Sequence, residues 1–254
     1  MQFNQTKTYK NLARSFAGES QAGMRYQMIA RTATKQGYFE LANVIKEIAK
    51  NETVHARRFF EELHKRGDNP DNINLDAGYP FHSGDICDGL RFAALDESEE
   101  HSKIYPAFAQ DAKDEGFNDI AALYTLIAQV EKRHQQIFEY LYKAFESGNL
   151  YKNESPILYV CAECGYMHTA TQAWDVCPLC KASQGHVKLH LPYEKEKLWE
   201  RMLTNKSKQR KTKQRTERPS KTVNNFYSKD DPLGSYTGVP ENEDEIPVQD
   251  ADDL

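Results

Sequence analysis

The sequence predicts a mostly α-helical protein: a four-helix bundle, then a small four-cysteine metal domain, then a charged tail. Three observations support this. Long segments carry apolar residues at helical spacing, two Cys-x-x-Cys pairs follow them, and blocks of opposite charge end the chain. A chain of 254 residues has room for two domains and a tail. We place the bundle at 1–148, a polar linker at 149–156, the cysteine domain at 157–192 and the tail at 193–254.

Each of the four helical segments repeats its inward-facing residues at spacings of three and four, as an amphipathic helix does. The inward stripes are Leu12, Phe16, Glu19, Gly23, Tyr26 and Ala30 in the first; Leu41, Ile45, Ile48, Glu52, His55, Phe59 and Leu63 in the second; Leu90, Ala93, Glu97, Glu100, Ile104 and Phe108 in the third; and Ile120, Tyr124, Ile127, Glu131, His134, Phe138, Leu141 and Phe145 in the fourth.

The connections between the helices predict how they are arranged. The first and second segments, and the third and fourth, are joined by short links, which makes each pair an antiparallel hairpin. The link from Arg66 to about Asp85 is longer and rich in Gly, Pro, Asn and Asp. It predicts the long crossover of a ferritin-like bundle. Pro106 lies within the third segment and should kink it.

Acidic residues and histidines occupy inward positions where a packed core should hold Leu or Ile. Glu52-x-x-His55 in the second segment matches Glu131-x-x-His134 in the fourth, each at an offset of 79. Glu19 in the first segment matches Glu97 in the third, at an offset of 78. A buried carboxylate needs a cation or metal partner. The chain is therefore interpreted as two copies of one helical hairpin that face each other.

One Glu from each of two helices, with Glu-x-x-His from the other two, is the ligand set of a di-metal carboxylate bundle. Oxygen and imidazole ligands suit iron or manganese, and two ferrous ions would cancel the four carboxylate charges. The alternative is that these residues form a set of ordinary ion pairs. Ion pairs are a poor explanation for two copies of the same residues in register. Glu100 is a fifth carboxylate on the stripe, where the first hairpin has Ala22. It would let one iron exchange His55 for an oxygen ligand.

The four paired cysteines predict a second metal site. Cys161, Cys164, Cys177 and Cys180 form two knuckles whose thiolates make a closed tetrahedral site for Fe or Zn. Cys-Gly-Tyr, Cys-Pro-x-Cys and the nearby Tyr159, Tyr166 and Trp174 favour one rubredoxin-like iron over a structural zinc ribbon. Cys87 remains as an ordinary, partly buried thiol.

The composition also predicts the location of the protein and the character of its tail. No apolar run is long enough to span a membrane, and the N-terminus lacks the pattern of a secretory signal, so we expect a cytoplasmic protein with reduced thiols. A short helix is expected from Glu194 to Met202, followed by a mostly disordered tail. Its basic block (201–222) has no interleaved aromatic residues and precedes an acidic block (223–254), which makes nucleic-acid binding an unfavoured reading.

With these residues identified, the chain resembles rubrerythrin over roughly residues 1–192. The motifs are AGESQA, NETVHA, ESEEHSKIYPAFA, VEKRHQ, CAECGY and CPLC. The resemblance implies two irons in the bundle bridged by Glu52 and Glu131. It implies Glu19 with His55 or Glu100 on one iron, Glu97 with His134 on the other, and Tyr26 and Tyr105 bonded to ligand carboxylates. The catalytic set would be Glu52, Glu131, Glu100, His55, Tyr26 and Tyr105.

The family's activity gives the expected function. The resemblance implies a peroxidase that reduces hydrogen peroxide to water, with electrons from an NAD(P)H-dependent rubredoxin reductase or from rubredoxin. It also implies a homodimer, or a higher homo-oligomer, in which one subunit's four-cysteine iron faces the other's di-iron site. The alternative is a ferroxidase that stores iron, as ferritins do; an attached electron donor argues against it. The tail from about Lys195 has no counterpart in the family.

Overall fold

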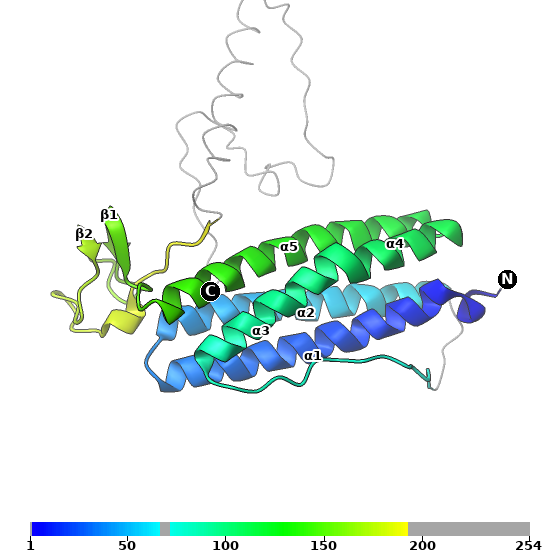
Figure 1. Ribbon diagram of the computed structural model, residues 1–254, viewed down its shortest axis with the longest axis horizontal. Helices are drawn as coiled ribbons and strands as arrows, with labels where there is room; N and C mark the ends of the chain where they lie inside the picture. The colour runs from blue at the N-terminus through cyan, green and yellow to red at the C-terminus, as the bar shows by residue number, and fades with distance from the viewer. Residues whose placement is uncertain (1, 67–71, 193–254) are drawn as a thin grey trace, which may run out of the picture. The chain divides into compact units, whose positions relative to one another are not determined.

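The computed structural model describes residues 2–66 and 72–192, and it confirms the four-helix bundle (Figure 1). The first two helices are α1 (Lys7–Lys35) and α2 (Phe39–Arg66), and the last is α5 (Asn118–Glu146). The third predicted helix consists of α3 (Ile86–Glu99), the π-helix η2 (Glu100–Ile104) and α4 (Tyr105–Asp114). Within the described residues, no helix has the length and apolarity needed to cross a membrane.

The predicted hairpins and crossover are present. Gly37 and Gly116 adopt positive φ values of 85° and 87° at the α1–α2 and α4–α5 turns, a conformation that glycine accepts without strain. The described part of the crossover, residues 72–84, runs along α1 (Figure 1). The hydroxyl of Tyr79 donates to the backbone carbonyl of Arg14 at 3.1 Å, and Gln21 donates to the carbonyl of Pro80. The crossover is therefore fastened to the bundle.

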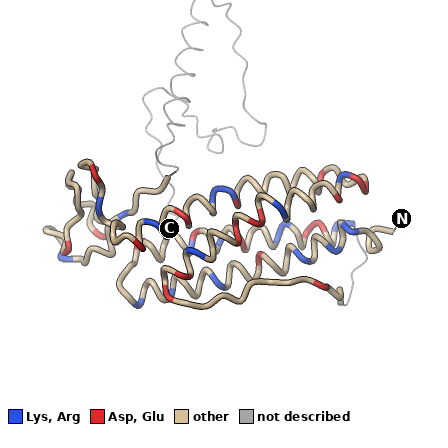
Figure 2. The backbone as a smooth tube through the Cα atoms, in the orientation of Figure 1, with Lys and Arg blue, Asp and Glu red and all other residues tan. Residues whose placement is uncertain are grey.

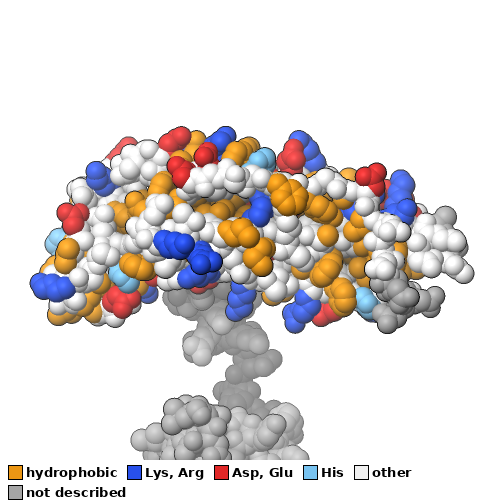
Figure 3. Space-filling view, turned by 90° about the horizontal axis from the view of Figure 1, so that it is seen from below, with side chains coloured by type: hydrophobic (Ala, Val, Ile, Leu, Met, Phe, Trp, Pro, Cys, Tyr) orange, Lys and Arg blue, Asp and Glu red, His pale blue; other side chains and the backbone are white. Residues whose placement is uncertain are grey.

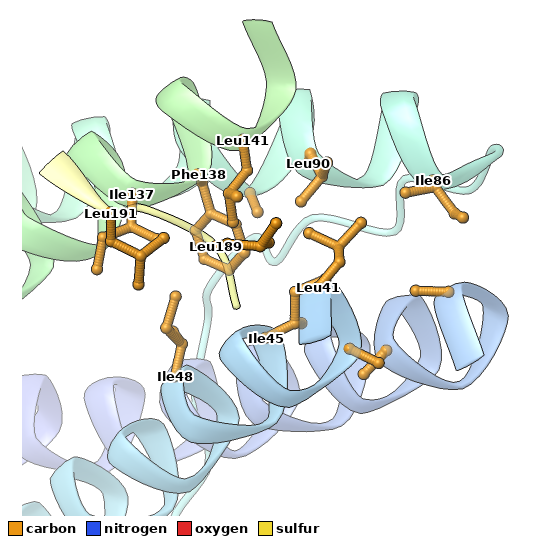
Figure 4. Packing of buried hydrophobic residues seen from close by; sticks show 14 of the residues in the cluster. Leu41, Ile45, Ile48, Ile86, Leu90, Ile137, Phe138, Leu141, Leu189 and Leu191 are labelled. Carbon is orange, nitrogen blue, oxygen red and sulfur yellow. The ribbon is translucent and has the colours of Figure 1, made fainter. Parts of the chain in front are cut away.

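Two apolar clusters fill the bundle, one toward each end. One contains Tyr26, Ile45 and Phe138, and its packing is shown in Figure 4. The other contains Leu12, Phe59 and Tyr124. The acidic and histidine side chains of the predicted site belong to neither cluster. Figure 2 shows acidic residues midway along the bundle helices as well as near their ends.

Two predicted inward positions are wrong. Phe16 is 36% exposed and packs beside Phe60, while Ser15 takes the buried position because its hydroxyl is bonded to that of Tyr124. Ile104 is 37% exposed, while Tyr105 is buried. The π-helix explains the second error. The N–H of Tyr105 bonds to the carbonyl of Glu100, five residues back, and this wider turn moves the inward position along by one residue.

The cysteine segment contains an antiparallel pair of strands, β1 (Lys152–Val160) and β2 (Met167–Gln172). β1 begins inside the predicted 149–156 linker, because Lys152 pairs with Gln172 before the register shifts ahead of Ile157. The predicted helix from Glu194 to Met202 and the charged tail lie outside the described residues.

The segment after the second knuckle packs against the bundle. Leu189 and Leu191 join the cluster formed by α2, α3 and α5 (Figure 4). The ring of His186 stacks on that of Phe39 with centroids 4.2 Å apart. The cysteine segment therefore shares an apolar core with the bundle, at the end where α1 turns into α2.

Candidate metal centres

The bundle brings six of the seven predicted bundle ligands together as two overlapping groups. One group is Glu19, Glu52, His55 and Glu131; the other is Glu52, Glu97, Glu131 and His134. Within each group the ligand atoms all lie within 4.8 Å of one another, and every member is buried. Glu52 and Glu131 belong to both groups, as two carboxylates that bridge a pair of cations would.

Each histidine turns its Nδ1 atom into this cluster. Nδ1 of His55 lies 2.9 Å from Glu131, 3.2 Å from Glu52 and 3.6 Å from Glu19. Nδ1 of His134 lies 2.7 Å from Glu131 and 2.9 Å from Glu52. The Glu-x-x-His spacing causes this, because residues three apart on a helix share a face. The ligand atoms thus follow the repeat that the sequence predicted.

Buried atoms in the cluster are left without hydrogen bonds. They lie on five side chains, and the described residues fill the site that they face with hydrogen-bond acceptors rather than donors. The atoms are Oε2 of Glu19, Oε1 of Glu52, Oε2 of Glu97, both carboxylate oxygens of Glu131 and Nδ1 of His134. Unsatisfied buried acceptors cost free energy, and buried carboxylates demand cations. The donor set of oxygen and imidazole therefore fits two hard-to-intermediate divalent ions such as Fe²⁺.

The pKa values of the clustered glutamates reflect the same crowding of carboxylates. Burial, then the neighbouring charges of Glu131 and Glu52, raise the pKa of Glu19 well above its usual value. Burial and the same two carboxylates raise the pKa of Glu97. Burial alone would raise the pKa of Glu52 as well, but the imidazoles of His134 and His55 beside its oxygens hold that pKa far below its usual value. The ionised form of Glu52, one of the two shared carboxylates, is thus favoured.

Two tyrosines hold the outer glutamates. The hydroxyl of Tyr26 donates to Oε1 of Glu97 at 2.6 Å, and the hydroxyl of Tyr105 donates to Oε1 of Glu19. Both rings are almost fully buried. Each hairpin therefore supplies a tyrosine to the glutamate of the other hairpin.

Glu100 is the one predicted bundle ligand that belongs to neither group. It lies partly exposed at the start of η2 and lines a cavity of about 260 Å³ between α1 and the crossover, together with Arg14, Tyr79 and Tyr105. Burial, Glu131 and Glu52 raise the pKa of its carboxyl well above its usual value. Glu100 therefore stands beside Tyr105, on the Glu19 and His55 side of the cluster.

The four cysteines converge as predicted. Sγ of Cys161 lies 3.7 Å from that of Cys180, and Sγ of Cys164 lies 3.7 Å from that of Cys177. Four mutually close sulfurs make a closed site for a tetrahedral metal. Burial would raise the pKa of Cys177, but backbone N–H groups of Cys180 and Leu179 lower it to about 7.

The two knuckles have matching backbones. The N–H of Gly165 bonds to the carbonyl of Cys161, and the N–H of Lys181 bonds to that of Cys177. Gly165 and Lys181 both have positive φ, at 74° and 66°. Cys87, by contrast, lies away from these sulfurs with intermediate burial, and burial and nearby acids raise its pKa. It is the ordinary thiol that was expected.

One residue at the bundle site was missed by sequence reasoning. The side-chain amide of Asn51, which is exposed on α2, lies 3.2 Å from Nε2 of His134. It directly precedes Glu52 in the motif, so proximity in sequence was the available signal.

Comparison with known proteins decides the family. A family model described as rubrerythrin matches residues 10–81 and 88–171, and one described as the rubrerythrin rubredoxin-like domain matches 159–187. The chain belongs to the rubrerythrin family. It is accordingly a di-iron protein with a rubredoxin-like iron site, and the paired clusters described above fit both sites.

Individual relatives agree with this assignment. The chain is 40% identical over 185 residues to rubrerythrin-1 of Clostridium acetobutylicum, covering 72% of this chain and 94% of that one. It is 33% identical over 187 residues to rubrerythrin of Nitratidesulfovibrio vulgaris, covering 72% and 94%. A solved bacterioferritin of Desulfovibrio desulfuricans has a TM-score of 0.50 at 22% identity, covering 56% of this chain and 82% of that one. That likeness shows a ferritin-like fold.

Proposed function

We propose that the protein is a peroxidase that reduces hydrogen peroxide to water and so protects the cell against oxidative stress. The observation that carries the proposal is the pairing, in one chain, of a buried two-cation carboxylate cluster with a four-thiolate site. The balanced reaction is H₂O₂ + 2 H⁺ + 2 e⁻ → 2 H₂O, and a one-electron iron site attached to the bundle suits the return of those electrons. The donor would be an NAD(P)H-dependent rubredoxin reductase or rubredoxin.

In this proposal Glu52 and Glu131 would hold both irons of the bundle. Glu19 and His55 would complete the ligands of one iron, and Glu97 and His134 those of the other. The shared membership of the two carboxylates in both groups supports the bridging roles. When bound, the irons supply the two electrons of the reaction.

The protein's own groups would handle substrate and protons. The cavity lined by Tyr79, Glu100 and Tyr105 reaches the tyrosine that is bonded to Glu19, and it would offer peroxide an entrance. The raised pKa of Glu100 favours the protonated form of its carboxyl, which would then supply a proton to a departing oxygen. Tyr105, bonded to Glu19, keeps that carboxylate turned toward its iron. Glu100 can also replace His55 as an oxygen ligand.

The position of the four cysteines supports a homodimer or higher homo-oligomer. They follow α5, whose stretch from His134 to Glu146 alone is about 18 Å long. The cysteine segment packs against the end of the bundle where α1 turns into α2, away from the middle of α5 where Glu131 and His134 lie, so a second copy is the better recipient of its electrons. Apolar side chains remain exposed on α1 and α2, among them Met24, Met28 and Phe60. Figure 3 shows one face on which hydrophobic side chains lie open between basic ones.

The proposal is tested with purified, iron-loaded protein that is reduced without air and mixed with stoichiometric peroxide. Rapid appearance of the ferric–thiolate colour, with peroxide consumed and a much slower change in air, is expected. Glu52→Ala should lose di-iron assembly and turnover. Wild-type peroxide consumption by Glu52→Ala would show that the site assignment is wrong. No colour at any stage would mean that the four-cysteine site holds zinc or lies off the electron path.

The runner-up is a ferroxidase that stores iron, favoured only by the ferritin-like fold. Iron counting separates the two. Storage predicts many irons per chain in a large hollow assembly, whereas the peroxidase predicts about three, from the two bundle ions and one four-cysteine ion.

The five free cysteines suit a reducing compartment, and we infer that the protein works in the cytoplasm.

A further inference from the structure

The two hairpins of the bundle are near-copies, so the positions where they differ should explain any difference between the two irons. Residues of the second and fourth helices correspond at an offset of 79, which pairs Glu52 with Glu131 and His55 with His134. The same offset pairs Asn51 with Val130. The repeat therefore gives the aliphatic Val130 the place in the fourth helix that Asn51 holds in the second.

The outer nitrogen of His134 is held by a hydrogen-bonding group. Nε2 lies 3.2 Å from the Asn51 amide, while Nδ1 points into the carboxylate cluster. The atom nearest to Nε2 is Nδ2 of Asn51. When Nδ1 binds a metal, Nε2 keeps its proton, and a half-turn of the Asn51 amide puts Oδ1, which can accept this hydrogen bond, in the place of Nδ2. Such a bond fixes the ring's orientation and tautomer and strengthens the histidine as a ligand.

His55 has no such support. Its three close contacts, with Glu19, Glu52 and Glu131, are all made by Nδ1. Within residues 2–66 and 72–192, Nε2 of His55 has no hydrogen-bond partner. Glu100, the carboxylate without a counterpart in the first hairpin, lies on this same side, next to Tyr105 and hence to Glu19.

We propose that Asn51 is a positioning residue that locks His134, and that Val130 at the equivalent place leaves His55 as the histidine free to leave its iron. The inference rests on the ligand assignment of the proposed function. It explains why an exchange between histidine and Glu100 would be confined to one iron: that side combines an unsupported histidine with a spare carboxylate. The other side has neither.

The test measures iron release to a chelator from the reduced holoprotein, without peroxide. Samples are then reoxidised, and their ferric–thiolate absorbance reports the four-cysteine iron separately. The wild-type bundle should release its two irons in a fast and a slow phase. Asn51→Val should speed the slow phase by about tenfold or more, the range found for lost partners of metal-bound histidines. Val130→Asn, which gives His55 an amide, should slow the fast phase.

The matched control is Asn43→Val, because Asn43 is also an exposed asparagine of α2 but bonds to Glu40. The proposal is overturned if Asn51→Val releases iron as this control does, or if the fast phase is the one that changes. A Val130→Asn protein with an unchanged fast phase would refute the role given to Val130. Because no peroxide is used, these outcomes are independent of peroxidase activity. A bundle that binds no iron would instead overturn the proposed function.

Discussion

At the scale of single residues, the hydrogen bond from Tyr105 to Glu19 ties a buried carboxylate to a neighbouring helix. Tyr105→Phe removes the donor and leaves a buried oxygen without a partner, at a cost of about 1–3 kcal/mol. We expect a lower melting temperature and faster loss of iron from the His55 side. Calorimetry and chelator assays measure both. The control is Tyr9→Phe, which removes a hydroxyl from the same apolar cluster; equal effects of the two changes would contradict the role of Tyr105.

His134 gives the metal-free protein a predictable pH dependence. Burial would lower its pKa, but the carboxylates of Glu131 and Glu52 beside Nδ1 raise it from 6.5 to about 9. A raised folded-state pKa adds stability that is complete below pH 6.5 and is lost as the pH rises through about 9. The free energy of unfolding of the metal-free protein should therefore fall over this window, as urea titrations at several pH values would show. His134→Asn should flatten that part of the curve; an unchanged slope would assign the effect to other groups.

The ligand residues were predictable because metal chemistry fixes both residue type and spacing. Glu52, His55, Glu131 and His134 stand out in any sequence that repeats them in register. Asn51 was not predictable in the same way, because an exposed asparagine beside a ligand is chemically unremarkable until the distance to Nε2 of His134 is known. Phe16 was misplaced because it lies four residues after Leu12 and so fits the helical spacing, as does Ser15 at three; the hydroxyl pair with Tyr124 buries Ser15 instead.

At the scale of elements, the third helix shows the limit of periodicity. Pro106 predicted a kink in this helix, and the helix is interrupted just before Pro106, but the spacing of the residues could not predict the form of the interruption. A π-turn adds one residue to a helical turn, and only the hydrogen bond from Tyr105 to Glu100 reveals it. Its consequence is functional, because it turns Tyr105 inward to Glu19 and leaves Glu100 at the edge of the cavity.

The contact between the cysteine segment and the bundle depends on a glycine. A Cβ atom at Gly185 would lie 1.7 Å from the carbonyl oxygen of Gly37, a backbone atom that cannot swing away. Gly185→Ala should therefore displace the segment from the α1–α2 turn and destabilise the fold by about 1–3 kcal/mol. Thermal unfolding measures the loss. Gly78→Ala is the control, since a Cβ there meets nothing within 4 Å; similar stabilities for the two variants would show that the close contact is unimportant.

At the scale of the whole molecule, the question is which four-cysteine site serves which di-iron site. The cysteine segment packs at the end of its own bundle through Leu189 and Leu191, while Glu131 and His134 of the carboxylate cluster lie midway along α5. In a closed two-fold dimer, the commonest form of homo-oligomer, a residue of one copy contacts a different residue of the other copy. Such an arrangement would carry electrons between chains instead of within one.

Mixing two inactive variants tests this arrangement. Cys164→Ser should lack the four-cysteine iron and keep the bundle site, whereas Glu52→Ala should lack the bundle site and keep the four cysteines. If electrons pass between chains, subunit exchange creates mixed dimers with one working pair, and peroxide turnover should recover to about a quarter of the wild-type rate per chain. If electrons pass within a chain, every mixed dimer is dead, because neither chain holds both sites. Analytical ultracentrifugation and mass spectrometry of the mixture would confirm that exchange occurred, so that absent activity contradicts transfer between chains.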